Sequence, residues 1–234
     1  MKIALLCDTH CGIRNSSEVF LDNAEDFYTN IFFPECEKRG VKQILHLGDY
    51  YDHRKFVNFK ALNQNRRVFL DQLRKHNMIM DIIPGNHDTY YKNTNELNAL
   101  KECLGHYMNE VHIIMEPTVM QYGSLSMALL PWICADNYEP SMNFIRDCKA
   151  DWLGAHLELA NFEIGRGILA PHGMDAKIFK KFEQVLSGHY HTASRRDNIW
   201  YLGNPMEFFW SDAHDPKFFH ILDTESRQIE IHRS

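Results

Sequence analysis

The feature that most constrains this chain is that its apolar runs repeatedly end in side chains able to bind a metal. These motifs are CDTH at 7–10, GDYYDH at 48–53, GNHD at 85–88, GAH at 154–156 and GHYH at 188–191. Most contain a glycine, which lets the backbone pass close to a ligand or adopt a positive φ. The carboxyl edge of an open α/β sheet is where binding sites form. The pattern therefore predicts one site built from strand ends that lie far apart in the sequence.

The first half of the chain alternates predicted strands and helices. Apolar runs over residues 2–8, 41–49 and 78–88 indicate strands, each of which leads into one of the motifs. Helical periodicity over 15–39 and 58–76 predicts the intervening helices. This alternation is typical of helices packed outside a sheet core.

We expect the first helix to begin at Asn15, as its N-cap, with Glu18 three residues later in a capping box. Gly40 is the expected stop signal. Pro34 should kink or break the helix, because proline lacks the backbone N–H that helical bonding needs.

The second half is denser in predicted strands. These cover residues 111–115, 118–122, 125–132, 151–158, 185–191, 199–205, 218–223 and 228–234, with short helices over 95–104 and 139–148.

Composition sets broad limits on the chain. Its 234 residues suit one large domain, or one domain with a small appendage, and a 44% hydrophobic content can form a proper core. A net charge of -6 without long runs of one sign argues against purely electrostatic DNA binding. The six cysteines include no CxxC pair, so we expect reduced, mostly buried thiols. The apolar start before Asp8 is too short for a signal peptide or membrane span, which predicts a cytoplasmic protein.

The motifs supply carboxylate, imidazole and amide groups, a mixed donor set that suits manganese, iron or zinc. The candidate ligands are Asp8, His10, Asp49, Asn86, His156, His189 and His191. Seven are too many for one tetrahedral zinc ion, so we expect two metals that share a carboxylate. In an extended segment His189 and His191 would point to the same side, roughly 6–7 Å apart. Each could then reach one ion of a pair roughly 3.5–4 Å apart.

A single buried histidine is more often structural than a metal ligand, and an acid at a strand end often caps a turn. The interpretation as a metal site therefore rests on five motifs that occur together in a fixed order. DxH, GDxxD, GNHD, GxH and GHxH, in that order, resemble the calcineurin-like metallophosphoesterase superfamily. The segments 85–93, LLPW at 129–132 and YLGNP at 201–205 resemble its SbcC–SbcD-type nuclease subunits (Mre/Rad-type DNA repair nucleases), especially phage recombination endonucleases. The resemblance covers about residues 2–225.

The resemblance implies an α/β fold, a two-sheet β-sandwich flanked by helices. It implies that 1–234 is one metallophosphoesterase (nuclease) domain, without the C-terminal capping and ATPase-binding regions of the family. The family favours Mn²⁺. Its first metal ion would be held by Asp8, His10, Asp49 and His191, with Asp49 bridging to a second ion held by Asn86, His156 and His189.

His87 would contact the scissile phosphate and assist the leaving group, and the adjacent Asp88 would orient a ligand. Many family members have histidine where this chain has Asp52, with His53 following. Either Asp52 or His53 is therefore a candidate to face the substrate.

The implied function is that of a manganese-dependent DNA exo/endonuclease subunit. It would act in double-strand break processing and recombination with an SbcC/Rad-type ABC ATPase partner. The resemblance also implies a homodimer, whose interface candidates are Leu62, Phe69, Leu97 and Leu100. No membrane association is expected, and a phage protein of this kind would act in the host cytoplasm.

Two alternatives stay open. GDYYD resembles the GDYxD of phosphoprotein phosphatases, but these usually carry GNHE where this chain has GNHD. A phosphatase or small-molecule phosphodiesterase is thus one alternative. A non-catalytic DNA-end tether is the other, and the intact ligand set argues against it. Phe208, Phe209 and Trp210 could stack on bases, although packing in the core or against a neighbour is the preferred interpretation.

Overall fold

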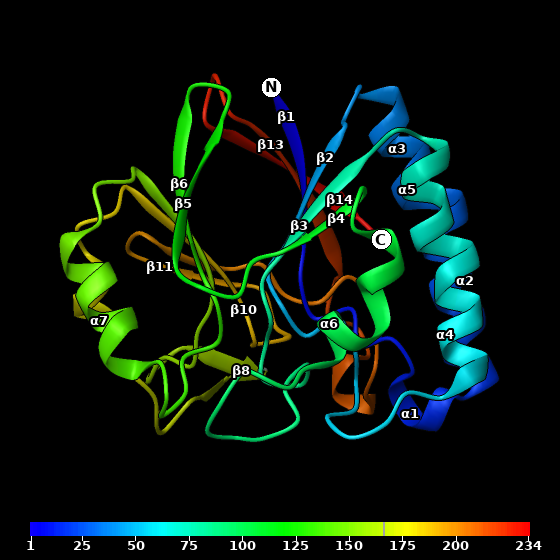
Figure 1. The fold of residues 1–234 in the computed structure, drawn as a ribbon, viewed down its shortest axis with the longest axis horizontal. Helices are drawn as coiled ribbons and strands as arrows, with labels where there is room; N and C mark the ends of the chain where they lie inside the picture. The colour runs from blue at the N-terminus through cyan, green and yellow to red at the C-terminus, as the bar shows by residue number, and fades with distance from the viewer. Residues whose placement is uncertain (166) are drawn as a thin grey trace.

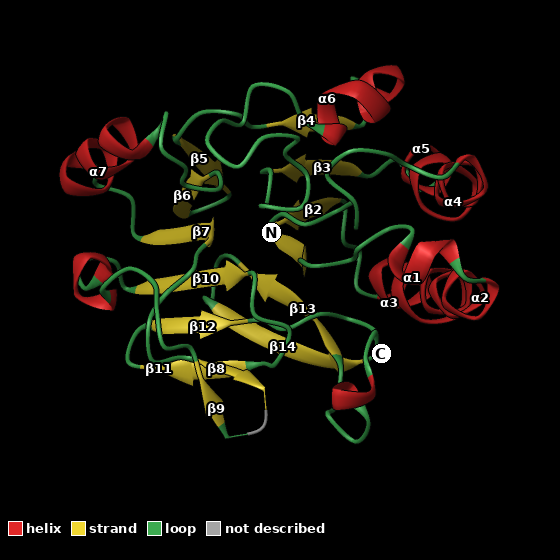
Figure 2. Cartoon of the chain, turned by 90° about the horizontal axis from the view of Figure 1, so that it is seen from below, coloured by secondary structure: helices red, strands yellow, loops and turns green. Residues whose placement is uncertain are grey.

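The computed structural model describes residues 1–165 and 167–234. Within these residues two six-stranded sheets lie in the middle of the molecule, with helices on the outside (Figures 1 and 2). The first sheet has the order β14 (Gln228–Arg233), β13 (Phe218–Asp223), β1 (Lys2–Leu6), β2 (Gln43–His46), β3 (Ile79–Ile82) and β4 (Val111–Ile113). The second has the order β11 (Ser194–Arg196), β12 (Ile199–Tyr201), β10 (Gln184–Gly188), β7 (Trp152–His156), β6 (Leu125–Leu130) and β5 (Thr118–Tyr122). The predicted two-sheet fold flanked by helices is confirmed.

Parallel pairing brings the motif-bearing strand ends to one edge. Strands β1 to β4 are parallel neighbours in the first sheet, and β6, β7, β10 and β12 are parallel neighbours in the second. In Figure 1, β1 begins at the top, and the loops that follow β1, β2 and β3 gather toward the lower edge. The five sequence motifs therefore converge there.

Strand β1 is buried on both faces, as expected for a central parallel strand. Ile3 and Leu5 face the second sheet and join Leu45, Leu129 and Leu186 in the core between the sheets. The alternate residues of β1 pack instead against the helices.

The first helical region runs through α1 (Ile13–Ser16), α2 (Glu18–Asp26), a π-helical segment (Phe27–Phe32) and α3 (Phe33–Lys38). The predicted cap at Asn15 is wrong. Asn15 has φ +56° inside the left-handed turn of α1, a conformation that asparagine tolerates well, and Ser17 immediately precedes α2. Pro34 lies in the first turn of α3, directly after the π-helical segment, where its missing N–H is tolerated. Gly40, with φ +66°, follows the helix end as predicted.

The second helical region follows its prediction. It consists of α4 (Phe59–Asn65), a π-helical segment (Arg66–Leu70) and α5 (Asp71–Lys75). The Asn58 side chain caps it by accepting a 2.8 Å hydrogen bond from the Lys60 N–H.

Two further α-helices, α6 and α7, lie outside these two helical regions in the described part of the chain. Helix α6 (Ala99–Leu104) starts later than predicted because Asn98 caps it, and α7 (Tyr138–Asp147) matches its prediction within one residue. Short 3₁₀ turns cover Gly105–Tyr107, Ala176–Phe179 and Trp210–Asp212. A small hairpin of β8 (Glu163–Gly165) and β9 (Ile168–Leu169) was not predicted from the sequence.

Some surface expectations need correction. Phe69 and Leu100 are fully buried in the chain's own core, so they cannot form the suggested dimer interface. Phe208 is also buried, whereas Trp210 is 93% exposed. All six cysteines are free, and four of them are buried, as expected. Among the described residues there is no helix with the length and apolar character needed to cross a membrane.

Candidate metal centre

The strands end abruptly where the candidate ligands begin. Asp8, His10, Asp49 and His189 have φ values of 50°, 42°, 54° and 94°. Such left-handed backbone costs roughly 1–3 kcal/mol per residue and persists only where the surrounding structure enforces it. The sharp turns direct these side chains into a common space at the edge of the two sheets.

Two glycines let the loops approach this closely. A Cβ atom added to Gly85 would lie 2.2 Å from Asp49 Oδ1. One added to Gly188 would lie 2.7 Å from the Leu47 carbonyl oxygen and 2.9 Å from Asp8 Oδ2. A side chain at either position would displace a carboxylate of the site.

The first ligand group combines Asp8, His10 and His191, whose ligand atoms all lie within 4.8 Å of one another. The two histidine Nε2 atoms are 3.0 Å apart, and His191 Nε2 is 4.0 Å from Asp8 Oδ1. The Asp8 carboxylate also accepts the backbone N–H of His189. A strand end of the first sheet is thereby tied to one of the second.

The second group combines Asp49, His156 and His189. His156 Nε2 lies 3.4 Å from Asp49 Oδ2. The Asn86 Oδ1 atom is 3.0 Å from His156 Nε2 and 2.9 Å from His189 Nδ1. Asp49 Oδ2 is also 3.8 Å from His10 Nε2 of the first group, so Asp49 lies between the two groups. The structure thus brings all seven candidate ligands together.

The geometric argument for the histidine pair was wrong in one respect. Strand β10 ends at Gly188, and His189 has a positive φ, so His189 and His191 do not form an extended segment. They nevertheless join different ligand groups, because the turn at His189 separates the two side chains.

The hydrogen-bonding chemistry of the second group fits a bound cation. His156 Nδ1 donates a 2.8 Å hydrogen bond to the Leu47 carbonyl oxygen, so the neutral ring carries its lone pair on Nε2. That lone pair faces the Asn86 and Asp49 oxygens, which are both acceptors. Only a proton or a cation among these atoms can make the arrangement favourable. Mixed imidazole, carboxylate and amide donors suit a divalent transition metal.

The pKa shifts indicate that a proton and a metal ion compete for the same position. Burial alone would lower the pKa of His156, but Asp49 and then Asp8 outweigh it and raise the pKa to about 9. Burial would raise the pKa of Asp49, but His156 and His10 hold it well below its usual range. Burial lowers the pKa of His189 to about 3. Without metal, a proton therefore stays on His156 at neutral pH, at the position where a cation would bind.

Asp88 holds the loops through hydrogen bonds to their backbone. Its buried carboxylate accepts backbone N–H bonds from Gly85 at 2.9 Å and from Tyr50 and Tyr51 at 3.0 Å. Burial, then Asp49, raises the pKa of Asp88 to about 7. It therefore fixes the loop after β2 against the loop after β3, and with them Asp49 and Asn86.

The sequence did not reveal the groups that support the histidines. The Leu47 carbonyl sets the His156 tautomer, and nothing in residue type marks such a backbone group. The Trp132 ring packs against His156 and His189, with centroids 5.8 and 5.4 Å away. Phe208 similarly packs 5.7 Å from His10. The LLPW motif, which begins within the last residues of β6, was the signal in the sequence for Trp132.

The two candidates for a substrate-facing residue are placed differently. Asp52 Oδ1 is 3.4 Å from His10 Nδ1, and Asp52 forms a third ligand group with His10 and His87. The His53 ring is exposed and stacks on Phe56, with centroids 4.0 Å apart. The geometry favours Asp52 as the residue beside the metal centre.

His87, a partly buried member of this group, is held by hydrogen bonds through its ring and its backbone. Its Nδ1 donates a 2.7 Å hydrogen bond to the Asp52 carbonyl oxygen, and its ring centroid is 4.8 Å from that of His10. Its backbone N–H donates to Asp49 Oδ1 at 2.7 Å. The tautomer that this requires leaves Nε2 as the nitrogen available to a substrate.

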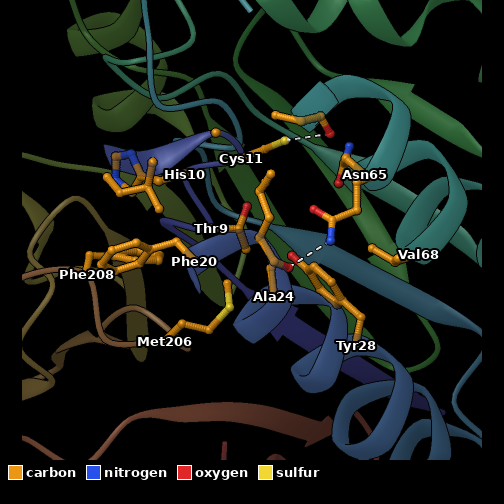
Figure 3. A pocket seen from close by; sticks show the side chains of 15 residues that line it. Thr9, His10, Cys11, Phe20, Ala24, Tyr28, Asn65, Val68, Met206 and Phe208 are labelled. Carbon is orange, nitrogen blue, oxygen red and sulfur yellow. Dashed lines mark hydrogen bonds between the residues drawn. The ribbon is translucent and has the colours of Figure 1, made fainter. Parts of the chain in front are cut away.

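A separate small cavity lies behind His10 (Figure 3). Thr9, Cys11, Tyr28 and Met206 are among its lining residues, and its volume is about 30 Å³. That is room for very few water molecules. The cavity is therefore too small for a substrate.

The model of the calcineurin-like phosphoesterase family matches residues 1–215. The chain belongs to this family. It is 30% identical over 231 residues to exonuclease subunit 1 of Enterobacteria phage T4, a match that covers 99% of this chain and 67% of that protein. Such phosphoesterases use divalent metals, and the ligand groups described above are this chain's candidates for holding them.

Two solved structures share the fold of this calcineurin-like phosphoesterase. An archaeal phosphodiesterase is 16% identical, with a TM-score of 0.50 and all of both chains covered. A hypothetical protein from Thermus thermophilus is 13% identical, with a TM-score of 0.51 and 100% and 99% of the chains covered.

Proposed function

We propose that this protein is a DNA nuclease that hydrolyses phosphodiester bonds at a centre of two divalent metal ions. The observation that carries the proposal is the position of Asp49 between two groups of ligands. A carboxylate so placed can bridge two ions. The 30% identity to a phage exonuclease subunit supports DNA as the substrate.

In this proposal Asp8, His10, Asp49 and His191 hold the first ion, and Asp49, Asn86, His156 and His189 hold the second. Bound ions would supply the Lewis acidity that activates water and neutralises the phosphate oxygens as charge develops. The chain contributes rigid positioning. The Leu47 carbonyl orients His156, the backbone N–H of His189 orients Asp8, and Asp88 holds the loops that carry Asp49 and Asn86.

His87 is the proposed catalytic residue for the leaving group. With Nδ1–H bonded to the Asp52 carbonyl oxygen, Nε2 can contact the scissile phosphate. When the ring is doubly protonated, Nε2–H can donate its proton to the departing oxygen, which leaves the neutral ring with its proton on Nδ1. The Asp52 carboxylate would keep the His10 ring in place from 3.4 Å. His53 takes no part in this arrangement.

The finer assignments are also proposals. We infer Mn²⁺ as the metal, because the family that the motifs resemble favours it and mixed nitrogen and oxygen donors suit it. We infer an SbcC-type ATPase as partner, with a role in double-strand break processing and recombination. The relative's name as a subunit supports assembly with another chain. We also infer a homodimer, whose remaining interface candidates are Leu97, which is 39% exposed, and the partly buried Leu62.

The test is release of label from an end-labelled linear DNA duplex with Mn²⁺, beside an EDTA control and a phosphomonoester in a parallel reaction. Metal-dependent DNA cleavage with little monoester hydrolysis is expected. Rapid monoester hydrolysis with intact DNA would favour a phosphatase. His87→Ala should abolish cleavage while Mn²⁺ binding, followed by calorimetry, persists; loss of metal in this variant would make His87 a ligand.

A further inference from the structure

The loops after β2 and β3 gather positive charge and aromatic rings that the proposed chemistry does not use. Residues 53–60 read HRKFVNFK and residues 89–92 read TYYK. These two stretches hold Arg54, Lys55, Lys60 and Lys92 and contain no acid, in a chain of net charge -6. Lys60 is paired with Glu18, so the charge that the surface offers comes from Arg54, Lys55 and Lys92. Positive charge interleaved with aromatic rings is what surfaces for single-stranded nucleic acids combine.

Direct contacts join the two stretches into one surface. Arg54 Nη1 donates to the Thr89 carbonyl oxygen at 3.3 Å and lies 3.2 Å from Thr89 Oγ1. Lys55 Nζ lies 5.7 Å from the centroid of the Tyr90 ring. A ligand that binds one loop therefore meets a surface that the other loop holds in place.

Three aromatic rings of this surface face solvent. Phe56 is 60% exposed, Phe59 is 84% exposed and Tyr91 is 51% exposed. Burying a phenylalanine side chain is worth roughly 1.5–3 kcal/mol, so this surface forgoes a stabilisation that a bound partner could recover. The His53 ring stacks on one face of Phe56, with centroids 4.0 Å apart.

The surface is continuous with the metal centre. Asp52, directly before His53, accepts the hydrogen bond of His87 through its carbonyl oxygen. Asp88, directly before Thr89, holds the backbone of Tyr50 and Tyr51. The same two loops thus carry ligands at their strand ends and Phe56 and Tyr91 a few residues further on, and Phe59 begins the helix α4 that follows the first loop.

We propose that Phe56, Phe59 and Tyr91 stack on unpaired bases of a single DNA strand, while the neighbouring lysines contact its phosphates. The inference rests on the proposed function and specifies its substrate as a strand that is unpaired beside the metal centre. Stacking requires exposed base faces, which a closed duplex does not offer. Local positive charge on an acidic protein complements the phosphate backbone.

The test compares binding of a fluorescein-labelled oligothymidine to the wild-type protein and to Phe56→Ala/Phe59→Ala, by fluorescence anisotropy in EDTA. We expect the double variant to bind at least about 30-fold more weakly, since two stacked bases together contribute about 2–6 kcal/mol. Tyr138→Ala is the matched control, because Tyr138 is also 51% exposed but lies on α7. Its affinity should equal that of the wild type.

Salt dependence tests the lysines separately. Lys55→Gln and Lys92→Gln should each reduce the slope of log affinity against log salt by about 0.7, the value for one phosphate contact of a single strand. The phenylalanine variant should lose less affinity for a blunt duplex than for the oligothymidine. Equal losses for both substrates would contradict base stacking.

No binding by the wild-type protein, or equal binding by the phenylalanine variant, would overturn the inference and leave a protein partner as the occupant to test. The proposed function is judged independently, by hydrolysis of bis(p-nitrophenyl) phosphate with Mn²⁺. The phenylalanine variant should match the wild type there, since neither ring touches a ligand. A wild-type protein that binds oligothymidine but cleaves neither DNA nor this diester would contradict the nuclease proposal and not the binding surface.

Discussion

Two buried aspartates, Asp49 in the loop after β2 and Asp81 within β3, have opposite surroundings. Asp81, in β3, accepts hydrogen bonds from Tyr122 Oη at 2.6 Å, Gln43 Nε2 at 2.9 Å and His112 Nδ1 at 2.9 Å. Asp49 Oδ1 accepts one N–H, from His87, while Oδ2 faces the histidine nitrogens of both ligand groups at 3.4 and 3.8 Å. Both side chains are almost inaccessible to solvent.

The difference separates a structural carboxylate from a binding one. Around Asp81 each contact pairs a donor with an acceptor, so the cluster is complete with protein atoms alone. At Asp49 the carboxylate oxygen Oδ2 faces the lone pair of His156 Nε2. These two acceptors can bind each other only through a proton or a cation between them. Residue type does not distinguish the two sites, since each combines aspartate with histidine and an amide.

Of the substitutions that test this contrast between Asp49 and Asp81, Asp49→Asn should have the largest effect on metal binding. Because Asp49 lies between both ligand groups, this variant should lose hydrolysis and bind metal more weakly by more than the roughly 10–100-fold that loss of an outer partner costs. Calorimetric titration with Mn²⁺ measures the affinity. Circular dichroism checks that the fold is retained, and a variant with unchanged affinity would remove Asp49 from the centre.

Gly85→Ala should have the next largest effect. The added Cβ would lie 2.2 Å from Asp49 Oδ1, so the carboxylate must move. We expect a loss of metal affinity of roughly 10–100-fold, the range seen when the support of a ligand is removed. Gly105→Ala is the control, since no atom lies within 4 Å of its added Cβ. Equal affinities in both variants would show that the close approach at Gly85 is unimportant.

Asp81→Asn should affect stability and spare metal binding. The amide cannot accept from all three donors, so we expect a loss of about 1–3 kcal/mol in the free energy of unfolding. Urea denaturation measures this loss, and the Mn²⁺ affinity should equal that of the wild type. A clear fall in metal affinity would mean that the two aspartates are coupled and that the contrast between them is wrong.

A change of one pH unit is expected to have a smaller effect. The pKa of His156 is raised to about 9 from 6.5, so below about pH 9 a metal ion must displace a proton from this ring. Mn²⁺ affinity should therefore rise with pH through this window, by up to about tenfold per unit for one displaced proton. The rise in melting temperature on adding Mn²⁺ provides the measurement. If it is flat between about pH 6.5 and 9, His156 is not a ligand that competes with protons.

The strand ends were the part of the site that sequence could predict. Burial of the strands requires apolar runs, and parallel pairing brings their carboxyl ends to one edge, so the order of the motifs was sufficient to name the seven candidates. The fold class followed from the family resemblance that the same motifs carry.

The remaining details depend on backbone conformation, which residue type specifies weakly. Asn15 was predicted to cap a helix and instead lies in a left-handed turn, a role that asparagine fills equally well. His189 was expected in an extended strand, but its positive φ directs it to the second group. The structural role of Asp81 was not predicted, because nothing in its sequence context reveals its three hydrogen-bond partners.

The central claim is that acceptors facing one another at Asp49 mark a centre for two divalent ions. Calorimetric titration of Mn²⁺ into metal-stripped protein tests it most directly. The account predicts that the wild-type chain binds two ions and that Asp49→Asn binds them far more weakly. A wild-type chain that takes up no Mn²⁺, or a single ion that Asp49→Asn binds equally well, would contradict it.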